Sequence, residues 1–422
     1  MTPPPTMSEL WRVFGRIGVL SFGGPAGQIA LMHRELVEQR PWLGEREFLS
    51  ALSFCMLLPG PEAMQLATYA GWKLRGVPGG LLAGALFVLP GAAVVLALSA
   101  LYATFGSVPL VQALFLGVQA AVVVIVVEAL LKVSRRALKS PGAWAIAAAA
   151  FVAIFALGVP FPLIVLGAAL AGAALLPAPA PAPDAPIHPG ATPRATPRTR
   201  ALWGALWLVP LAALWAGPGG ILAEIGLFFS KLAVVTFGGA YAVLAYMTQE
   251  VVEGYRWLTT AEMIDGLGLA ETTPGPLILV TQFVGFLAAW REGGFVLGLA
   301  GAAVTLWMTF VPCFLWVFAG APWIGTLGRR PRLGAALAGV TAAVVGVILN
   351  LSLWFAAHVF FDSVGQIGAG PLSLIAPDPA TIDLRAVAIA AVAAVLIFAL
   401  HRGLPLVLGV SAGLGIAFSG LG

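Results

Sequence analysis

Long apolar runs without charge constrain this chain more than any other feature. Residues 79–102 and 293–328 contain no Asp, Glu, Lys or Arg. A helix needs about 20 apolar residues to cross the hydrocarbon core of a bilayer, so both runs are long enough to span one. Hydrophobic residues make up 60% of the 422 positions and charged residues only 9%. The composition excludes a soluble fold and predicts an all-α, polytopic protein surrounded by a lipid bilayer.

An internal duplication organises the chain. Adding 215 to a residue number in the first half gives the matching residue in the second half. By this rule Phe22-Gly23-Gly24 matches Phe237-Gly238-Gly239, and Pro59-Gly60-Pro61 matches Pro274-Gly275-Pro276. Further identities share the offset: Glu9 with Glu224, Met32 with Met247, Glu35 with Glu250, Glu38 with Glu253, Trp42-Leu43 with Trp257-Leu258, and Glu47 with Glu262. The chain is therefore two copies of one unit.

The copies are separated by a compositional break. Residues 177–200 are rich in Ala and Pro and end in three arginines, which is typical of an extended, solvated linker on the cytoplasmic side. An apolar segment with no counterpart in the first half follows it. We expect the first repeat at residues 1–176, the linker at 177–200, one connecting transmembrane helix at 201–218 and the second repeat at 219–422.

The positions of Lys and Arg predict the orientation of the two copies, because short cytoplasmic loops are enriched in these residues. In the first half of the chain, the basic cluster comes after the second apolar segment that follows Pro-Gly-Pro. In the second half, it comes after the first apolar segment that follows Pro-Gly-Pro. These clusters are Lys132, Arg135, Arg136 and Lys139, and Arg329, Arg330 and Arg332. The shift predicts inverted-topology repeats with about 13 spans and a cytoplasmic N-terminus. Residues 141–176, interrupted at 158–162, form either two spans or one bent hairpin.

Each copy contains two predicted breaks in its helices, at Phe-Gly-Gly and at Pro-Gly-Pro. Gly and Pro interrupt the helical hydrogen-bond ladder, and such interruptions are tolerated in a membrane where they line a polar cavity. A helix that begins after a break presents backbone N–H groups and the positive end of its dipole, which together favour an anion. We expect four such ends to converge on an anion site. The alternative is that the breaks are only kinks.

Charged side chains lie close to these breaks. Arg16 and Lys231 occupy equivalent positions, six residues before each Phe-Gly-Gly, and are candidate ligands for an oxyanion. Their alternative role is snorkelling to the membrane interface. Glu62 and Glu271 flank the two Pro-Gly-Pro motifs and are candidates for proton binding or for pairing with the basic residues. Glu62 has a second interpretation, as the complement of its own helix N-terminus.

Neutral polar residues near the breaks complete the candidate site. Gln65, Thr272 and Thr273 follow or precede the two Pro-Gly-Pro motifs. Each taken alone is better explained by an interhelical hydrogen bond. The sequence contains no nucleophile triad, phosphate loop or metal-ligand spacing, so we expect neither an enzyme nor a cofactor, metal or nucleic-acid partner.

Three strings carry a family resemblance: residues 21–25 (SFGGP), 58–65 (LPGPEAMQ) and 271–276 (ETTPGP). In a duplicated membrane protein of this length they resemble the long, two-domain members of the chromate ion transporter family. The resemblance implies export of chromate across the bacterial cytoplasmic (inner) membrane, driven by the proton motive force and conferring chromate resistance. Sulfate is the competing analogue that it implies.

The predicted site combines the motifs and the charges around them. The candidate substrate-binding residues are Arg16, Phe22, Gly23, Gly24, Pro59, Gly60, Pro61, Gln65, Lys231, Phe237, Gly238, Gly239, Thr272, Thr273, Pro274, Gly275 and Pro276. The candidate proton-coupling residues are Glu62 and Glu271. A passive anion channel built from the same helix ends is the alternative function, and a homodimer remains open.

Overall fold

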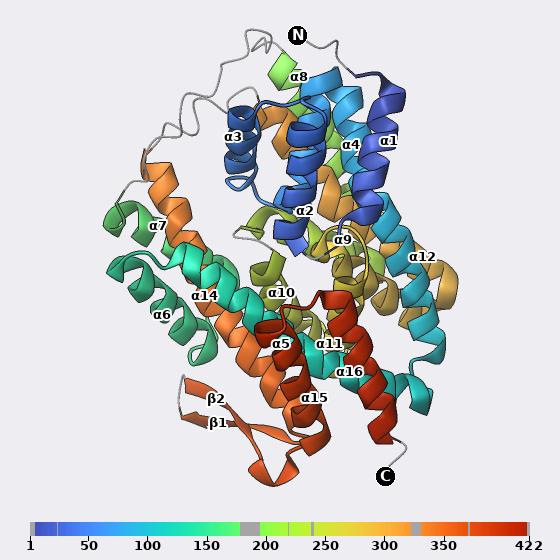
Figure 1. Ribbon diagram of the computed structural model, residues 1–422, viewed down its shortest axis with the longest axis vertical. Helices are drawn as coiled ribbons and strands as arrows, with labels where there is room; N and C mark the ends of the chain where they lie inside the picture. The colour runs from blue at the N-terminus through green and yellow to red at the C-terminus, as the bar shows by residue number, and fades with distance from the viewer. Residues whose placement is uncertain are drawn as a thin grey trace. The chain divides into compact units, whose positions relative to one another are not determined.

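The computed structural model describes residues 5–22, 24–177, 195–217, 219–237, 240–321, 331–369 and 372–419, most of them helical (Figure 1). The first half contains α1 (Met7–Leu20), α2 (Gly24–His33), η1 (Arg34–Gln39), α3 (Glu45–Cys55), α4 (Glu62–Phe105), α5 (Pro109–Ala137), α6 (Pro141–Phe155) and α7 (Phe161–Leu175). After α8 (Ala195–Ala216), the second half contains α9 (Ile221–Val235), α10 (Ala240–Gln249), η2 (Glu250–Gly254), α11 (Thr260–Thr272), η3 (Leu277–Leu279), α12 (Val280–Gly320), α14 (Pro331–Phe360), β1 (Val364–Ala369), β2 (Leu372–Pro377), η5 (Pro379–Thr381), α15 (Leu384–Ala394), η6 (Val395–Ala399) and α16 (Leu404–Ser419).

The two halves repeat the same order of elements. Helices α1 to α7 correspond to α9, α10, α11, α12, α14, α15 and α16, and the π-helical turns η1 and η2 follow α2 and α10. Local backbone bonds repeat at the sequence offset as well: Trp42 N–H donates to Leu36 O at 3.1 Å, and Trp257 N–H donates to Val251 O at 2.9 Å. The duplication seen in the sequence is therefore also present in the backbone.

Helices α4 and α12 are hairpins rather than straight rods. The backbone leaves the helical region at Gly76 (φ 64°) and at Gly294 (φ 71°), a conformation that favours glycine. The legs then pack backbone against backbone, since a Cβ on Gly71 would lie 2.2 Å from Gly79 O and one on Gly301 would lie 2.3 Å from Gly285 O. Each contains one short leg followed by one long leg.

Helix lengths separate two classes of segment. Within the part of the chain that the structure describes, five helices are long and apolar enough to cross a membrane: α4, α5, the stretch Pro197–Ala216 of α8, the stretch Leu277–Gly320 that contains α12, and α14. By contrast α1 has 14 residues, which is about 21 Å of helix and less than the roughly 30 Å of a hydrocarbon core. The lengths support a multi-pass membrane protein, while the count of about 13 spans stays a prediction.

Helices α6 and α7 are both short. Each has 15 residues, and the turn between them contains Gly158 at φ 59°. A Cβ on Gly142, at the start of α6, would lie 3.1 Å from the Leu176 side chain just beyond α7, so the two helices run antiparallel. Antiparallel packing is common to both alternatives for residues 141–176, two short spans or one bent hairpin, so the choice between them stays a prediction.

Two features depart from the sequence-based expectations. The fold is not all-α, because β1 and β2 form an antiparallel hairpin with Val364 opposite Pro377 and Ala369 opposite Leu372. Two strands of six residues leave only a weak pattern in an otherwise apolar chain. The second departure is the linker, whose last six residues already belong to α8, which begins at Ala195. Residues 178–194 and the predicted basic residues Arg329 and Arg330 lie outside the described residues.

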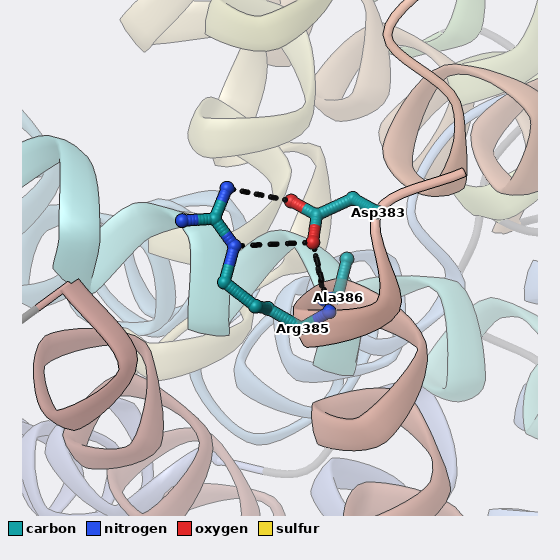
Figure 2. A network of polar contacts seen from close by, with 3 residues as sticks. All are labelled: Asp383, Arg385 and Ala386. Carbon is teal, nitrogen blue, oxygen red and sulfur yellow. Dashed lines mark hydrogen bonds and ion pairs between the residues drawn. The ribbon is translucent and has the colours of Figure 1, made fainter. Parts of the chain in front are cut away.

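The start of α15 after the β-hairpin is set by one side chain. Asp383 is the N-cap, and its Oδ1 accepts hydrogen bonds from the backbone N–H of Arg385 at 2.8 Å and of Ala386 at 3.3 Å (Figure 2). The Arg385 guanidinium also bonds to this carboxylate, at 3.2 Å. The cap satisfies amide groups that have no partner within a helix.

The chain forms two compact units that cut across the two repeats. Unit 1 consists of Met1–Ala100, Pro179–Ala240 and Thr273–Pro331, and unit 2 consists of Leu101–Ala178, Tyr241–Thr272 and Arg332–Gly422. The segment 24–55 of the first repeat belongs to unit 1, whereas its equivalent, 240–272, belongs almost entirely to unit 2. Each unit is therefore built from both halves of the sequence.

Candidate functional site

The breaks of opposite halves are bonded to each other in unit 1. Gly60 N–H donates to Thr236 O at 2.8 Å, and Gly275 N–H donates to Ser21 O at 2.9 Å. Adding 215 to 60 and to 21 gives 275 and 236, so these two bonds are the same contact with the halves exchanged. Such reciprocity is the pattern of a two-fold relationship between equivalent surfaces.

The residues around each break repeat this geometry in detail. The Ser21 hydroxyl donates to Ile17 O at 2.6 Å, and the Thr236 hydroxyl donates to Leu232 O at 2.5 Å. Both hydroxyls thus donate to the carbonyl oxygen four residues earlier. The next residue in each half also makes the same backbone hydrogen bond. Phe22 N–H donates to Leu20 O, as Phe237 N–H does to Val235 O. Gly23, Gly238 and Gly239, which we predicted for the site, lie outside the described residues.

The breaks of the first half are turns at which the chain reverses. Lys73 Nζ lies 2.8 Å from Glu47 Oε1, and these residues stand twelve positions after Pro61 and twelve before Pro59. Across the other break, Arg16 Nη1 lies 3.7 Å from Glu35 Oε1. The sequence predicted interruptions at both positions, but the reversal is visible only in the structure. In the first half, the two breaks therefore lie where one helix ends and the chain turns back into the next.

The four helix ends are not equivalent as anion sites. At α2, Ala26 and Gly27 are exposed, and a Cβ on Gly24 would meet nothing within 4 Å. By contrast, α4 begins with the acidic Glu62, and the residues of η3 before α12 are buried and apolar. Gly60 and Gly275 precede the first residues of α4 and η3, and their own N–H groups donate to carbonyl oxygens of the other half. Of these three ends, at α2, α4 and η3, the described residues of α2 combine an exposed first turn with the absence of a carboxylate.

Two glutamine side chains hold the Pro-Gly-Pro turns. Gln65 Nε2 donates to Pro59 O at 2.7 Å, so this predicted site residue supports its own turn. Gln28 Nε2 donates to Gly275 O at 2.7 Å and bridges the two halves. Gln28 has no equivalent at the offset and was not expected in the site, although it lies one turn into the helix after Phe-Gly-Gly. The hydroxyl of Thr272 is exposed and donates to Leu269 O, whereas Thr273 is buried.

The two predicted basic ligands differ in their surroundings. Glu35 is 1% exposed, with Arg40 Nη1 at 2.5 Å and Arg16 at 3.7 Å. The Arg16 side chain is itself 56% exposed, so only part of it is covered on the side of Glu35 and the rest is accessible. Lys231 is exposed on α9. The part of Arg16 that faces away from Glu35 remains able to contact an anion.

Unit 2 holds two buried carboxylates on α11. Glu271 is 7% exposed and accepts a hydrogen bond of 2.7 Å from the Tyr241 hydroxyl. Asp265 is 5% exposed and accepts hydrogen bonds of 2.7 Å from the Tyr102 hydroxyl and from Gln119 Nε2. A buried carboxylate is costly as an ion unless its surroundings compensate the charge, and these donors are all neutral. We did not predict Asp265, although it interrupts the same apolar stretch as Glu271.

A duplicated, mainly helical membrane protein whose interrupted helices meet at equivalent turns has the architecture of a membrane transporter. The family model described as "Chromate transporter" matches residues 8–173 and 223–416, so the chain belongs to the chromate transporter family. The members of this family to which it is similar are named as transport proteins, not enzymes.

Three relatives show the extent of the similarity. The chain is 30% identical to a probable chromate transport protein of Synechococcus elongatus, over 92% of this chain and 95% of that protein. It is 33% identical to the chromate transport protein of Cupriavidus metallidurans, over 85% of both chains. It is 32% identical to the chromate transport protein of Pseudomonas aeruginosa, over 82% of this chain and 80% of that protein. No solved structure matches the chain.

Proposed function

We propose that the protein exports chromate, or a closely similar oxyanion such as sulfate, across the bacterial cytoplasmic membrane as a secondary transporter. Family membership supports chromate transport, since relatives that match most of the chain are named for it. The observation that carries the proposal is the reciprocal pair of bonds that joins Gly60 to Thr236 and Gly275 to Ser21. Two equivalent contacts that open in turn are a natural device for alternating access.

In this proposal the two repeats are inverted, the N-terminus is cytoplasmic and the chain makes about 13 crossings. The oxyanion binds at the first turn of α2, close to the breaks, with the exposed side of Arg16 contributing positive charge. The open space at Gly24 and the small exposed Ala26 and Gly27 support this location. Lys231, Phe22 and the two Pro-Gly-Pro turns form the remainder of the proposed site.

Electrical driving force favours the proposed direction. Moving one charge through 100 mV is worth about 2.3 kcal/mol, so a dianion that leaves an inside-negative cell gains roughly 4.6 kcal/mol. Proton antiport adds to this driving force and requires a group that binds a proton during the cycle. Glu271 and Glu62 fill that role in the proposal, and the burial of Glu271 beside a neutral tyrosine hydroxyl supports it.

The direct test measures uptake of radiolabelled chromate into everted membrane vesicles, with sulfate as competitor. An energised membrane should drive saturable uptake, and preloaded unlabelled chromate should accelerate it by counterflow. Ionic currents far above a carrier's turnover would instead indicate an anion channel. Uptake equal to that of vesicles without the protein would contradict chromate export.

The proton-coupling role is tested by Glu271→Gln and Glu62→Gln, with Glu224→Gln, an exposed position on α9, as the matched control. We expect the response of chromate uptake to an imposed pH gradient to be lost in at least one of the first two variants and kept in the control. The response to membrane potential should remain in all three. Unchanged pH dependence in both test variants would exclude these carboxylates from coupling.

A further inference from the structure

The first repeat contains a histidine held between two carboxylates, and the second repeat has no histidine at the equivalent position. His33 Nδ1 lies 3.0 Å from Glu38 Oε1, and His33 Nε2 lies 2.7 Å from Glu45 Oε2. The hydrogen bond to Glu45 raises the pKa of His33, which favours the imidazolium form. The offset of 215 places Thr248 at the position of His33, Glu253 at that of Glu38 and Thr260 at that of Glu45. The second repeat therefore keeps one carboxylate and replaces the basic group with a hydroxyl.

A cavity of about 120 Å³ lies at this position in unit 2. Its polar lining comes from Thr248 and Gln249 of α10, Glu253 of η2, Asn350 of α14 and Gln366 of β1. Thr248 is 2% exposed, and its hydroxyl oxygen has no hydrogen-bond partner among the described residues. A water molecule takes up about 30 Å³ of liquid volume, so the cavity has room for an ion and a few waters.

The chemistry of the lining selects the ligand. Hydroxyl, amide and carboxylate oxygens are the ligands of hard cations, and none of the described residues that line the cavity is Lys, Arg or His. The single carboxylate, Glu253, balances one positive charge. The Trp354 side chain bonds to Glu253 and thereby holds it at the cavity.

We propose that this cavity binds a monovalent alkali cation, with oxygens of Thr248 and Glu253 among its ligands, in the place that the His33 side chain occupies in the first repeat. The site does not depend on the proposed transport of chromate. Helices α6 and α14 start near basic residues, Lys139 and Arg332, and run toward the cavity. Short cytoplasmic loops are enriched in basic residues, which assigns the cavity to the ends of these helices opposite the cytoplasm.

The test measures binding of Na⁺ to the purified full-length protein in Na⁺-free detergent buffer, using radioactive ²²Na⁺ and the shift of the thermal unfolding midpoint. Wild type should bind about one Na⁺ per chain and should unfold at a higher temperature in NaCl or KCl than in choline chloride at equal ionic strength. Glu253→Gln should weaken binding at least tenfold, and Thr248→Val should weaken it severalfold.

Three variants control for indirect effects. Thr248→Ser keeps the hydroxyl and should bind Na⁺ like wild type, and Glu250→Gln makes the same charge change at a residue that does not line the cavity. Thr248→His introduces the first repeat's residue and should remove Na⁺ binding from a protein that remains folded. Equal stabilisation by choline chloride, binding of Ca²⁺ without Na⁺ or K⁺, or full binding in both Glu253→Gln and Thr248→Val would each overturn the proposal. Chromate uptake is measured separately, so either proposal can fail alone.

Discussion

Glu35 illustrates how one buried charge organises its neighbours. It is almost fully buried, and two arginines approach it from α1 and from the residue after η1. The contact with Arg40 is a hydrogen-bonded ion pair, whereas Arg16 stands too far from Glu35 for a hydrogen bond. The two arginines are therefore expected to differ in what they contribute.

Substituting each arginine separates structure from substrate binding. Arg40→Met leaves Glu35 buried without its close partner and should lower the free energy of unfolding by about 3–5 kcal/mol. Arg16→Met removes a longer, solvent-screened pair and should cost only about 0.2–1 kcal/mol. Denaturant unfolding of the purified protein measures both, and Glu35→Gln combined with Arg40→Met should restore much of the loss. If Arg16→Met reduces chromate binding without lowering the free energy of unfolding, Arg16 contacts the substrate. Equal destabilisation by Arg16→Met and Arg40→Met would refute the assignment of a structural role to Arg40 and a binding role to Arg16.

His33 makes one part of the stability depend on pH. It lies outside the helices long enough to span a membrane, and hydrogen bonds to Glu45 and then Glu38 raise its pKa above the usual 6.5. A raised folded-state pKa contributes stability that is complete below pH 6.5 and is lost as pH rises through the folded value. At pH 6 the thermal unfolding midpoint of the wild-type protein should be higher than that of His33→Gln. The difference between the two midpoints should become smaller as the pH is raised to 9. A constant difference across this range would mean that the charge of His33 plays no part.

Among the helical elements, the open end of α2 offers the sharpest test of where the oxyanion binds. Ala26→Asp places a carboxylate in the first turn of α2, where it stabilises the helix but repels an anion. We expect chromate binding to weaken about tenfold while the thermal midpoint stays the same or rises. The neutral Ala26→Ser should behave like wild type. Equal chromate affinity in all three proteins would place the oxyanion elsewhere.

The helix breaks show how far local sequence determines an element. Gly and Pro at residues 59–61 and 274–276 predicted where the helices stop, because their effect on the backbone is local. The direction of the chain after each stop depends on contacts such as that between Lys73 and Glu47, which are twenty-six residues apart. The β-hairpin after α14 was missed for a related reason, since two six-residue strands owe their pairing to each other rather than to their own composition.

For the whole molecule, the interleaving of the repeats predicts that neither half is stable alone. Both compact units take segments from both repeats, and unit 1 contains the reciprocal bonds between the halves. We expect separately produced residues 1–185 and 186–422 to assemble when expressed together, to copurify through a tag on one piece and to restore chromate uptake. Each piece expressed alone should be degraded or aggregate. A stable, monodisperse first piece would show that the repeats fold as independent domains.

Composition and self-similarity were sufficient to establish several properties of this protein. The shortage of charge determined that the chain lies in a membrane, and a single offset determined that it is duplicated, because both are properties of residue order. Local Gly and Pro determined where its helices are interrupted. The sequence also identified Glu271 as a candidate functional residue, because it is a carboxylate in an otherwise apolar stretch.

Only the tertiary structure decided which parts of the two copies meet. Equivalent sequences cannot reveal that Gly60 bonds to the other half, that Gln28 reaches Gly275 across 247 positions, or that α2 has an open end while α4 begins with a carboxylate. The physical reason is that burial and pairing depend on the packing of residues distant in sequence. Two copies with the same local pattern therefore acquire different surroundings, as His33 and Thr248 show.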